Sequence, residues 1–289
     1  MIHPTPPGTR DILPEEMREL RALEAALRAA FEHHGFGEVA TPTIEYAEVL
    51  RQGDERYANA AYRFFDERGD LLAMRSDMTI PIARLVATRL QSEEPPFRLS
   101  YIAHAYRAVS PQRGQMREFT QAGVELIGAP APEGTAEVVE VLNGALDTAG
   151  LNRAIVGLGD ADLYSQLLSG VGVGSEARTR ILDRLAAHDL VGLEMEVDRV
   201  EGIGSEAQAT LLALPGMRGG PEVLDRATEL GGEAVERATQ RLRATYDALA
   251  ARGVADRLQL DLGLLRDLGY YTGAIVEVYD PALGHILGG

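Results

Sequence analysis

The sequence contains no cysteine. Disulfides, thiolate zinc sites and thiol nucleophiles are therefore excluded, and the stability of the fold must come from packing. The sequence also lacks any uninterrupted apolar run near the ~18 residues that a membrane-spanning helix requires. Its first residues do not combine a basic segment with an apolar one, as a secretion signal would. These absences predict a cytoplasmic protein with no membrane contact.

Basic residues are scarce relative to acidic ones. The chain has 28 lysines and arginines against 44 aspartates and glutamates, a formal net charge of -16. This charge repels the phosphate backbone of nucleic acids, so no nucleic-acid partner is expected. A local exception is one short stretch that contains four arginines: Arg98, Arg107, Arg113 and Arg117.

The rest of the composition is that of an ordinary globular protein. Hydrophobic residues make up 45% and charged residues 25% of the 289 positions. A chain of this length forms one large domain, or a domain with a sizeable insertion. The six histidines show no metal-ligand spacing, and Gly157–Gly159 lacks the remainder of a dinucleotide-binding fingerprint. Neither a metal nor a cofactor is expected.

Near the N-terminus, apolar residues recur at steps of three and four positions from Pro14 to about His34. This spacing predicts an amphipathic helix, and proline suits its first position. Farther along, residues 97–107 and 118–127 have strand character and flank the turn-like segment Ser110–Gly114. The pattern predicts a long antiparallel hairpin.

The middle of the chain differs from both ends. Residues 160–255 have the pattern of short helices separated by glycines, whereas Leu258–Leu262 and Tyr270–Tyr279 have the pattern of strands. We predict a core of residues 1–159, a mainly helical insertion of residues 160–255, and a return to the core sheet over residues 256–289.

Five segments contain motifs in a recognisable order: GTRDILP at 8–14, GFGEVATP at 35–42, LAMRSDMT at 72–79, PQRG with REFTQAGVE between 111 and 125, and RDLGYYTG at 266–273. They resemble the histidyl-tRNA synthetases, in which the second and fourth correspond to class II motifs 1 and 2. The resemblance implies an α+β fold, with a class II synthetase-like antiparallel sheet flanked by helices and a helical insertion. It also implies a homodimer that pairs through motif 1.

The same resemblance implies a histidine-binding site, made of Asp77, Thr79, Arg107, Gln121, Glu125, Arg266 and Tyr271. Glu125 would accept a hydrogen bond from the imidazole, and Gln121 would hold the ammonium beside Asp77 and Thr79. A guanidinium at Arg107 suits the ligand carboxylate. The Tyr271 hydroxyl would face the imidazole, and Arg266 would serve either ligand binding or interface pairing.

Each of these residues also has a simpler interpretation. Gln121 and Glu125 suit the exposed face of an antiparallel strand, Arg107 a solvated surface, and Tyr271 a strand core. Gly123 between the two polar residues favours a site, because a strand glycine often marks close approach by a ligand or a backbone.

Three departures from the synthetases point to a paralogous family. Val109 stands two positions after Arg107 in place of a glutamate that holds ATP, and Gln115 replaces a loop arginine. The sequence ends at Gly289, before motif 3 and the anticodon-binding domain of the family. With Met78 between Asp77 and Thr79, the pattern resembles the regulatory subunits of the short-form ATP phosphoribosyltransferases of histidine biosynthesis.

This resemblance implies a subunit with no catalytic residues. Its partner would be the catalytic subunit of ATP phosphoribosyltransferase, and the two would form a hetero-oligomer. Within it, this chain would confer activity and histidine feedback on the catalytic subunit. A histidine-activating ligase core is the alternative, and it accounts for the matching motifs but not for Val109 and Gln115. A nucleic-acid-binding module would account only for the arginine cluster.

Overall fold

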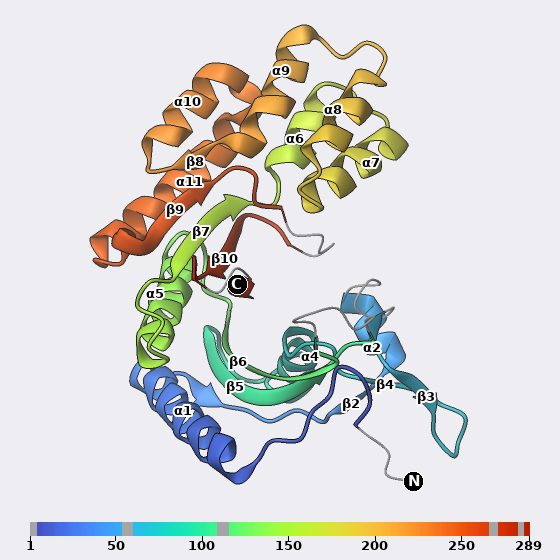
Figure 1. The fold of residues 1–289 in the computed structure, drawn as a ribbon, viewed down its shortest axis with the longest axis vertical. Helices are drawn as coiled ribbons and strands as arrows, with labels where there is room; N and C mark the ends of the chain where they lie inside the picture. Colours follow the sequence, from blue (N-terminus) through green and yellow to red (C-terminus); the bar gives the residue numbers. More distant parts are fainter. Residues whose placement is uncertain (1–4, 54–59, 109–115, 266–270, 283–285) are drawn as a thin grey trace. The chain divides into compact units, whose positions relative to one another are not determined.

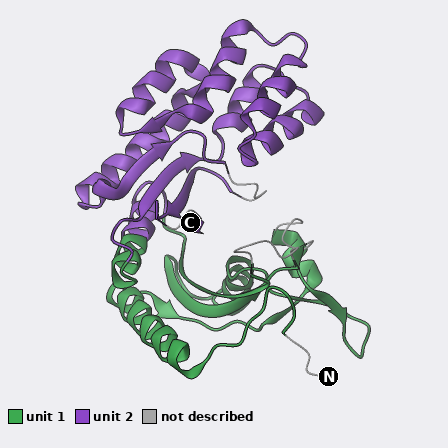
Figure 2. Ribbon diagram, viewed as in Figure 1, with its two compact units in different colours: residues 1–129, 141–150 green, residues 130–140, 151–289 purple. Residues whose placement is uncertain are grey.

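The computed structural model describes residues 5–53, 60–108, 116–265, 271–282 and 286–289. Contacts group the chain into two compact units, coloured green and purple in Figure 2: residues 1–129 with 141–150, and residues 130–140 with 151–289. The division predicted from the sequence, at residues 159 and 255, differs from this grouping and stays a prediction. Over the described ranges, no helix is both long and apolar enough to cross a bilayer.

The first unit consists of two small sheets and the helices that pack on them (Figure 1). In the described part of the unit, one sheet has the order β1-β5-β6 and the other β2-β4-β3. The strands are β1 Gly37–Glu38, β2 Ile44–Tyr46, β3 Arg63–Phe65, β4 Leu71–Met74, β5 Phe97–Tyr106 and β6 Glu118–Ile127. The helices are α1 Pro14–His33, α2 Ala47–Gly53 and α4 Thr79–Arg89, with part of α5 Glu133–Thr148.

The predicted N-terminal helix and hairpin are both confirmed. Helix α1 begins at Pro14, with Glu15 and Glu16 in its first turn, where the helix dipole favours negative charge. Strands β5 and β6 pair antiparallel from Phe97 opposite Ile127 to Tyr106 opposite Glu118. The turn predicted at Ser110–Gly114 lies outside the described residues.

The two faces of the β5–β6 hairpin pack against different helices. On one face, Val124 and Leu126 lie against a buried cluster that contains Phe31 of α1 and Val141 of α5. On the other face, Tyr101 lies in a cluster with Met78 and Ile82, at the start of α4; the cluster also includes Leu99 and Ile127. The period of two along β6 therefore directs Gln121 and Glu125 toward α4.

A buried guanidinium fixes the segment that precedes α4. Arg75 is only 5% exposed. Its Nε donates to the His104 carbonyl at 2.8 Å, and its Nη1 donates to the carbonyls of Thr41 at 2.7 Å and Pro42 at 3.3 Å. Burial lowers the pKa of Arg75 from its usual value, and three carbonyl acceptors compensate for the lost hydration. The side chain thus joins motif 1, the hairpin and the α4 segment.

The second unit packs helices on a sheet with the strand order β11-β10-β7-β9-β8 among the residues described. The strands are β7 Ile155–Asp160, β8 Arg218–Gly219, β9 Leu258–Asp261, β10 Ala274–Tyr279 and β11 Ile286–Gly288. The helices are α6 Leu163–Gly170, α7 Ser175–Ala186, α8 Leu190–Asp198, α9 Ser205–Ala213, α10 Glu222–Gly231 and α11 Glu233–Ala251, with short 3₁₀ turns η1 Leu214–Gly216 and η2 Ala255–Arg257.

The α+β class is confirmed, although the sheets are not purely antiparallel. Strand β1 pairs parallel with β5, and β7 pairs parallel with β9, whereas the β5–β6 and β7–β10 pairs are antiparallel. The strand expected at Tyr270–Tyr279 begins at Ala274 in the described part of the chain, and residues 266–270 lie outside it.

An ion pair joins the sheet of the second unit to its longest described helix. Asp160, at the end of β7, has a side chain that is 0% exposed. It accepts hydrogen bonds from Arg241 of α11, from Nε at 2.9 Å and from Nη2 at 2.7 Å. Burial nevertheless raises the pKa of Asp160, because the guanidinium offsets only part of the lost hydration.

Candidate functional site

The first unit gathers polar side chains between β6 and the start of α4. We call Asp77, Thr79, Tyr101, Gln121 and Glu125 the β6–α4 cluster. Thr79 is the first residue of α4, and its Oγ1 donates a hydrogen bond to Glu125 Oε1 at 2.8 Å. The helix start and the strand therefore meet through two of the predicted site residues.

Asp77 lies just before α4 and is buried. Its Oδ1 accepts a long hydrogen bond of 3.4 Å from the backbone N–H of Ile80. The first N–H groups of a helix have no partners within the helix and carry partial positive charge, so a carboxylate is stabilised there. The chain can thus hold a second acidic side chain close to Glu125.

Glu125 is an acid of the cluster with a strongly perturbed pKa. Burial raises the pKa of Glu125 to about 7; the donation from Thr79 lowers this pKa, and the nearby negative charge of Asp77 raises it. A carboxyl with a pKa near 7 exchanges its proton in the range in which a free imidazole also titrates. A cationic ligand placed beside it would favour the ionised form.

This pKa predicts a pH-dependent stability. The folded-state pKa of Glu125 is higher than the unfolded value, so its contribution to stability is complete below the unfolded pKa and is lost as the pH rises through about 7. Glutamine does not titrate, so Glu125→Gln should not lose this stability. We expect the free energy of unfolding of the variant, relative to that of the wild type, to rise by about 2 kcal/mol from about pH 5 to about pH 8. Urea unfolding of both proteins at the two pH values measures this, and a constant difference would contradict it.

Tyr101 is a member of the cluster that the sequence analysis missed. It lies opposite Gly123 on the paired strand, and a Cβ at position 123 would come within 2.5 Å of its hydroxyl oxygen. Gln121 Nε2 donates a hydrogen bond to the same oxygen at 3.2 Å. The close approach expected at Gly123 is therefore made by a tyrosine side chain, and an aromatic residue paired with a strand glycine was the available signal.

Two arginines of motif 2, Arg107 and Arg117, make contacts with neighbouring segments. Arg107 Nε donates to the Ser76 carbonyl at 3.2 Å, and its guanidinium lies over the Phe119 ring, 4.9 Å from the ring centroid. Arg117 donates its backbone N–H to the Gly8 carbonyl at 2.7 Å, which brings the first motif onto the start of β6. A positive φ of 80° at Gly8 and the Arg117 side chain beside it both favour glycine there.

Two predicted site residues, Tyr271 and Arg266, do not belong to the described part of the first unit. Tyr271 is half-buried and belongs to the second unit. Arg266 lies outside the described residues, as do Val109 and Gln115. The described part of the first unit thus contains five of the predicted site residues: Asp77, Thr79, Arg107, Gln121 and Glu125.

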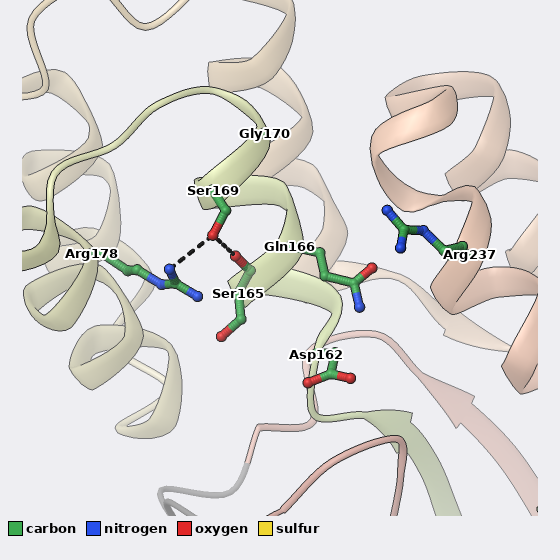
Figure 3. Close-up of a pocket in the computed structure, with 7 residues that line it drawn as sticks. All are labelled: Asp162, Ser165, Gln166, Ser169, Gly170, Arg178 and Arg237. Carbon is green, nitrogen blue, oxygen red and sulfur yellow. Dashed lines mark hydrogen bonds between the residues drawn. The ribbon is translucent and has the colours of Figure 1, made fainter.

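The second unit has a polar hollow of about 510 Å³ along α6 (Figure 3). Arg178 and Arg237 approach Gln166 and Ser169 from opposite sides, and Asp162 lies at one edge. Arg178 Nη1 donates to Ser169 Oγ at 2.8 Å, so part of this lining is already engaged. Its lining contains two arginines and one aspartate, so the charges of the lining do not cancel.

The β6–α4 cluster offers mainly acceptors. The carboxylate of Asp77 lies close enough to Glu125 to raise its pKa. The Gln121 Oε1 is buried and has no hydrogen-bond partner in the described structure. Groups of this kind bind a ligand with several N–H donors and positive charge.

Comparison with known proteins identifies the family of the chain. The family described as histidyl-tRNA synthetase matches residues 8–289. A protein of Symbiobacterium thermophilum, named ATP phosphoribosyltransferase regulatory subunit, is 42% identical over 98% of this chain and 72% of its own length. A protein of the same name from Desulforamulus reducens is 41% identical over 96% of this chain and 69% of its own length.

A solved structure gives the same result for the fold. The crystal structure of an ATP phosphoribosyltransferase regulatory subunit/histidyl-tRNA synthetase from Bacillus halodurans superposes with a TM-score of 0.90 at 30% identity. The match covers 99% of this chain and 75% of that one. The chain therefore belongs to the histidyl-tRNA synthetase family and, within it, to the ATP phosphoribosyltransferase regulatory subunits.

Proposed function

We propose that this chain is a non-catalytic subunit that activates the catalytic subunit of ATP phosphoribosyltransferase and makes it sensitive to histidine. The observation that supports this most is the identity of 41% to 42% with relatives that bear the regulatory-subunit name. Val109 and Gln115 add to it, because they replace a carboxylate and a cation that would hold ATP in a ligase. Phosphoryl chemistry requires such fixed charges.

Histidine is the proposed ligand of the β6–α4 cluster. Glu125 would bind the imidazole, whereas Asp77, Thr79 and Gln121 would bind the ammonium. Arg107 would hold the carboxylate, with Arg266 and Tyr271 completing the site. The buried acceptors and the raised pKa of Glu125 support a ligand that is rich in donors and can carry positive charge.

A homodimer through motif 1 is proposed as the building block of the hetero-oligomer. Strand β1, within motif 1, lies at the edge of its described sheet, and both of its residues are exposed. Just after the motif, Ile44 is 47% and Tyr46 58% exposed on β2. Exposed apolar side chains near one another often mark an interface, and isologous dimers are the commonest oligomers.

Co-expression with the catalytic subunit tests the proposed function. We expect the two chains to co-elute on size-exclusion chromatography, and transferase activity to depend on this chain and fall when histidine is added. Histidine and the catalytic partner must affect each other's binding equally, with a coupling of about 1 to 3 kcal/mol.

The control for this experiment is the catalytic subunit alone under the same conditions. The proposal would be wrong if the chains failed to co-elute, or if activity and histidine sensitivity were the same with and without this chain. Histidine-dependent exchange between ATP and pyrophosphate by this chain alone would instead favour the ligase alternative.

A further inference from the structure

The hairpin register gives Tyr101 a specific place in the β6–α4 cluster. Tyr101 on β5 lies opposite Gly123 on β6, and Gln121 and Glu125 lie on the same face of β6, one on each side of Gly123. A Cβ at Gly123 would be 2.5 Å from Tyr101 Oη and 2.8 Å from Cζ. The phenol therefore crosses β6 over Gly123, and only glycine leaves room for it.

In this position the hydroxyl engages the amide of Gln121. Gln121 Nε2 donates to Tyr101 Oη at 3.2 Å, so Oε1 is the end of the amide that stays available. Oε1 is buried and has no hydrogen-bond partner among the described residues. A buried acceptor without a partner is costly in a folded protein, which indicates that a ligand donor occupies it in the functional state.

The orientation of this amide affects which ligands can bind. A glutamine side chain presents an acceptor at one end and two donors at the other, and the two ends have nearly the same shape. With the oxygen toward the ligand, Gln121 attracts an ammonium group together with the carboxylates of Asp77 and Glu125. With the nitrogen toward the ligand, it would repel that group.

We propose that Tyr101 is a positioning residue that turns the oxygen of Gln121 toward the ligand and so selects ligands with a primary ammonium group. The proposal rests on the histidine site proposed above and adds to it a residue and a specificity. Tyr101 is buried against Met78 and Ile82, so its ring position is fixed by packing rather than by the ligand.

Calorimetry with two ligands tests this role in the full chain. Tyr101→Phe keeps the ring over Gly123 but removes the hydroxyl. We expect its histidine affinity to fall about five- to tenfold, the effect of one lost hydrogen bond. Imidazolelactate has a hydroxyl in place of the ammonium, and one hydroxyl can pair with either end of the amide. The affinity of Tyr101→Phe for imidazolelactate should therefore fall less than about twofold.

Two further variants separate positioning from structure. In a Gln121→Glu background both side-chain oxygens are acceptors, so adding Tyr101→Phe should cause no further loss of histidine affinity. Tyr106→Phe is the matched control, because Tyr106 lies on the same strand opposite Glu118 and outside the cluster. It should leave both affinities unchanged.

The outcomes are distinct. Equal losses for both ligands, or an unchanged histidine affinity in Tyr101→Phe, would overturn the positioning role while leaving the proposed histidine site intact. A wild-type chain that binds no histidine would overturn the site itself and the role of Tyr101 with it.

Discussion

Replacing Arg241 by methionine is expected to lower the free energy of unfolding of the second unit by about 3 to 5 kcal/mol at neutral pH. The substitution keeps the apolar stem of the side chain but leaves Asp160 charged, 0% exposed and without its two guanidinium hydrogen bonds. The loss should shrink as the pH falls, because a protonated Asp160 needs no counter-charge. Denaturant unfolding at several pH values measures both effects.

The same helix provides a matched control. Arg243 is as exposed as Arg241, at 39%, but its ion-pair partner Asp225 is 68% exposed. Arg243→Met should therefore cost no more than about 1 kcal/mol. Combining Arg241→Met with Asp160→Asn should recover much of the loss, since no buried charge then remains. Equal losses for the two arginine variants would show that the burial of Asp160 is unimportant.

Replacing Glu125 by alanine is expected to weaken histidine binding by about 2 to 5 kcal/mol, which is roughly 30-fold to several thousand-fold in affinity. Glu125 is a half-buried acid whose pKa lies near that of an imidazole, so a bound imidazolium would lose a counter-charge. Calorimetry on the purified chain compares the variant with the wild type.

Glu118 is the matched control for that measurement. It lies on β6 as well, but its position places it on the opposite face, and its side chain is 43% exposed beside His104. Glu118→Ala should leave the histidine affinity unchanged. If Glu125→Ala also bound histidine like the wild type, the ligand site would lie elsewhere in the protein.

Local patterns were sufficient to predict the longer elements of the first unit. The bounds of α1 follow from the apolar spacing after Pro14 and the glycines after His34, and β5 and β6 follow from two apolar runs around a turn segment. In the second unit, the short helices predicted over residues 160–255 correspond to α6 to α11. In each case the signal lies within the element itself.

The short strands were not predicted, for a physical reason. Strands β2 and β3 have three residues each, too few to show a period of two, and they exist through pairing with β4. The parallel pairing of β7 with β9 likewise depends on partners distant in sequence. Such pairings are set by tertiary packing, which a single sequence expresses weakly.

In the candidate site, too, local motifs were predictive and contacts between distant segments were not. The motifs assigned Thr79 and Glu125 to one site, and the structure joins these two side chains by a hydrogen bond. Tyr101 has no motif of its own and enters the cluster only because the hairpin register sets it opposite Gly123. A contact that depends on register becomes visible only when the two strands are paired.

The order of strands in the second unit also affects how the chain is made. Strand β7 ends at Asp160 and is mostly buried, yet its partners β9 and β10 begin only at Leu258 and Ala274. At roughly 5 to 20 residues per second, a ribosome needs about 5 to 20 s to add the intervening residues. During that time the apolar side chains of β7 are unpaired in the nascent chain, so this strand is where early aggregation or chaperone binding is favoured.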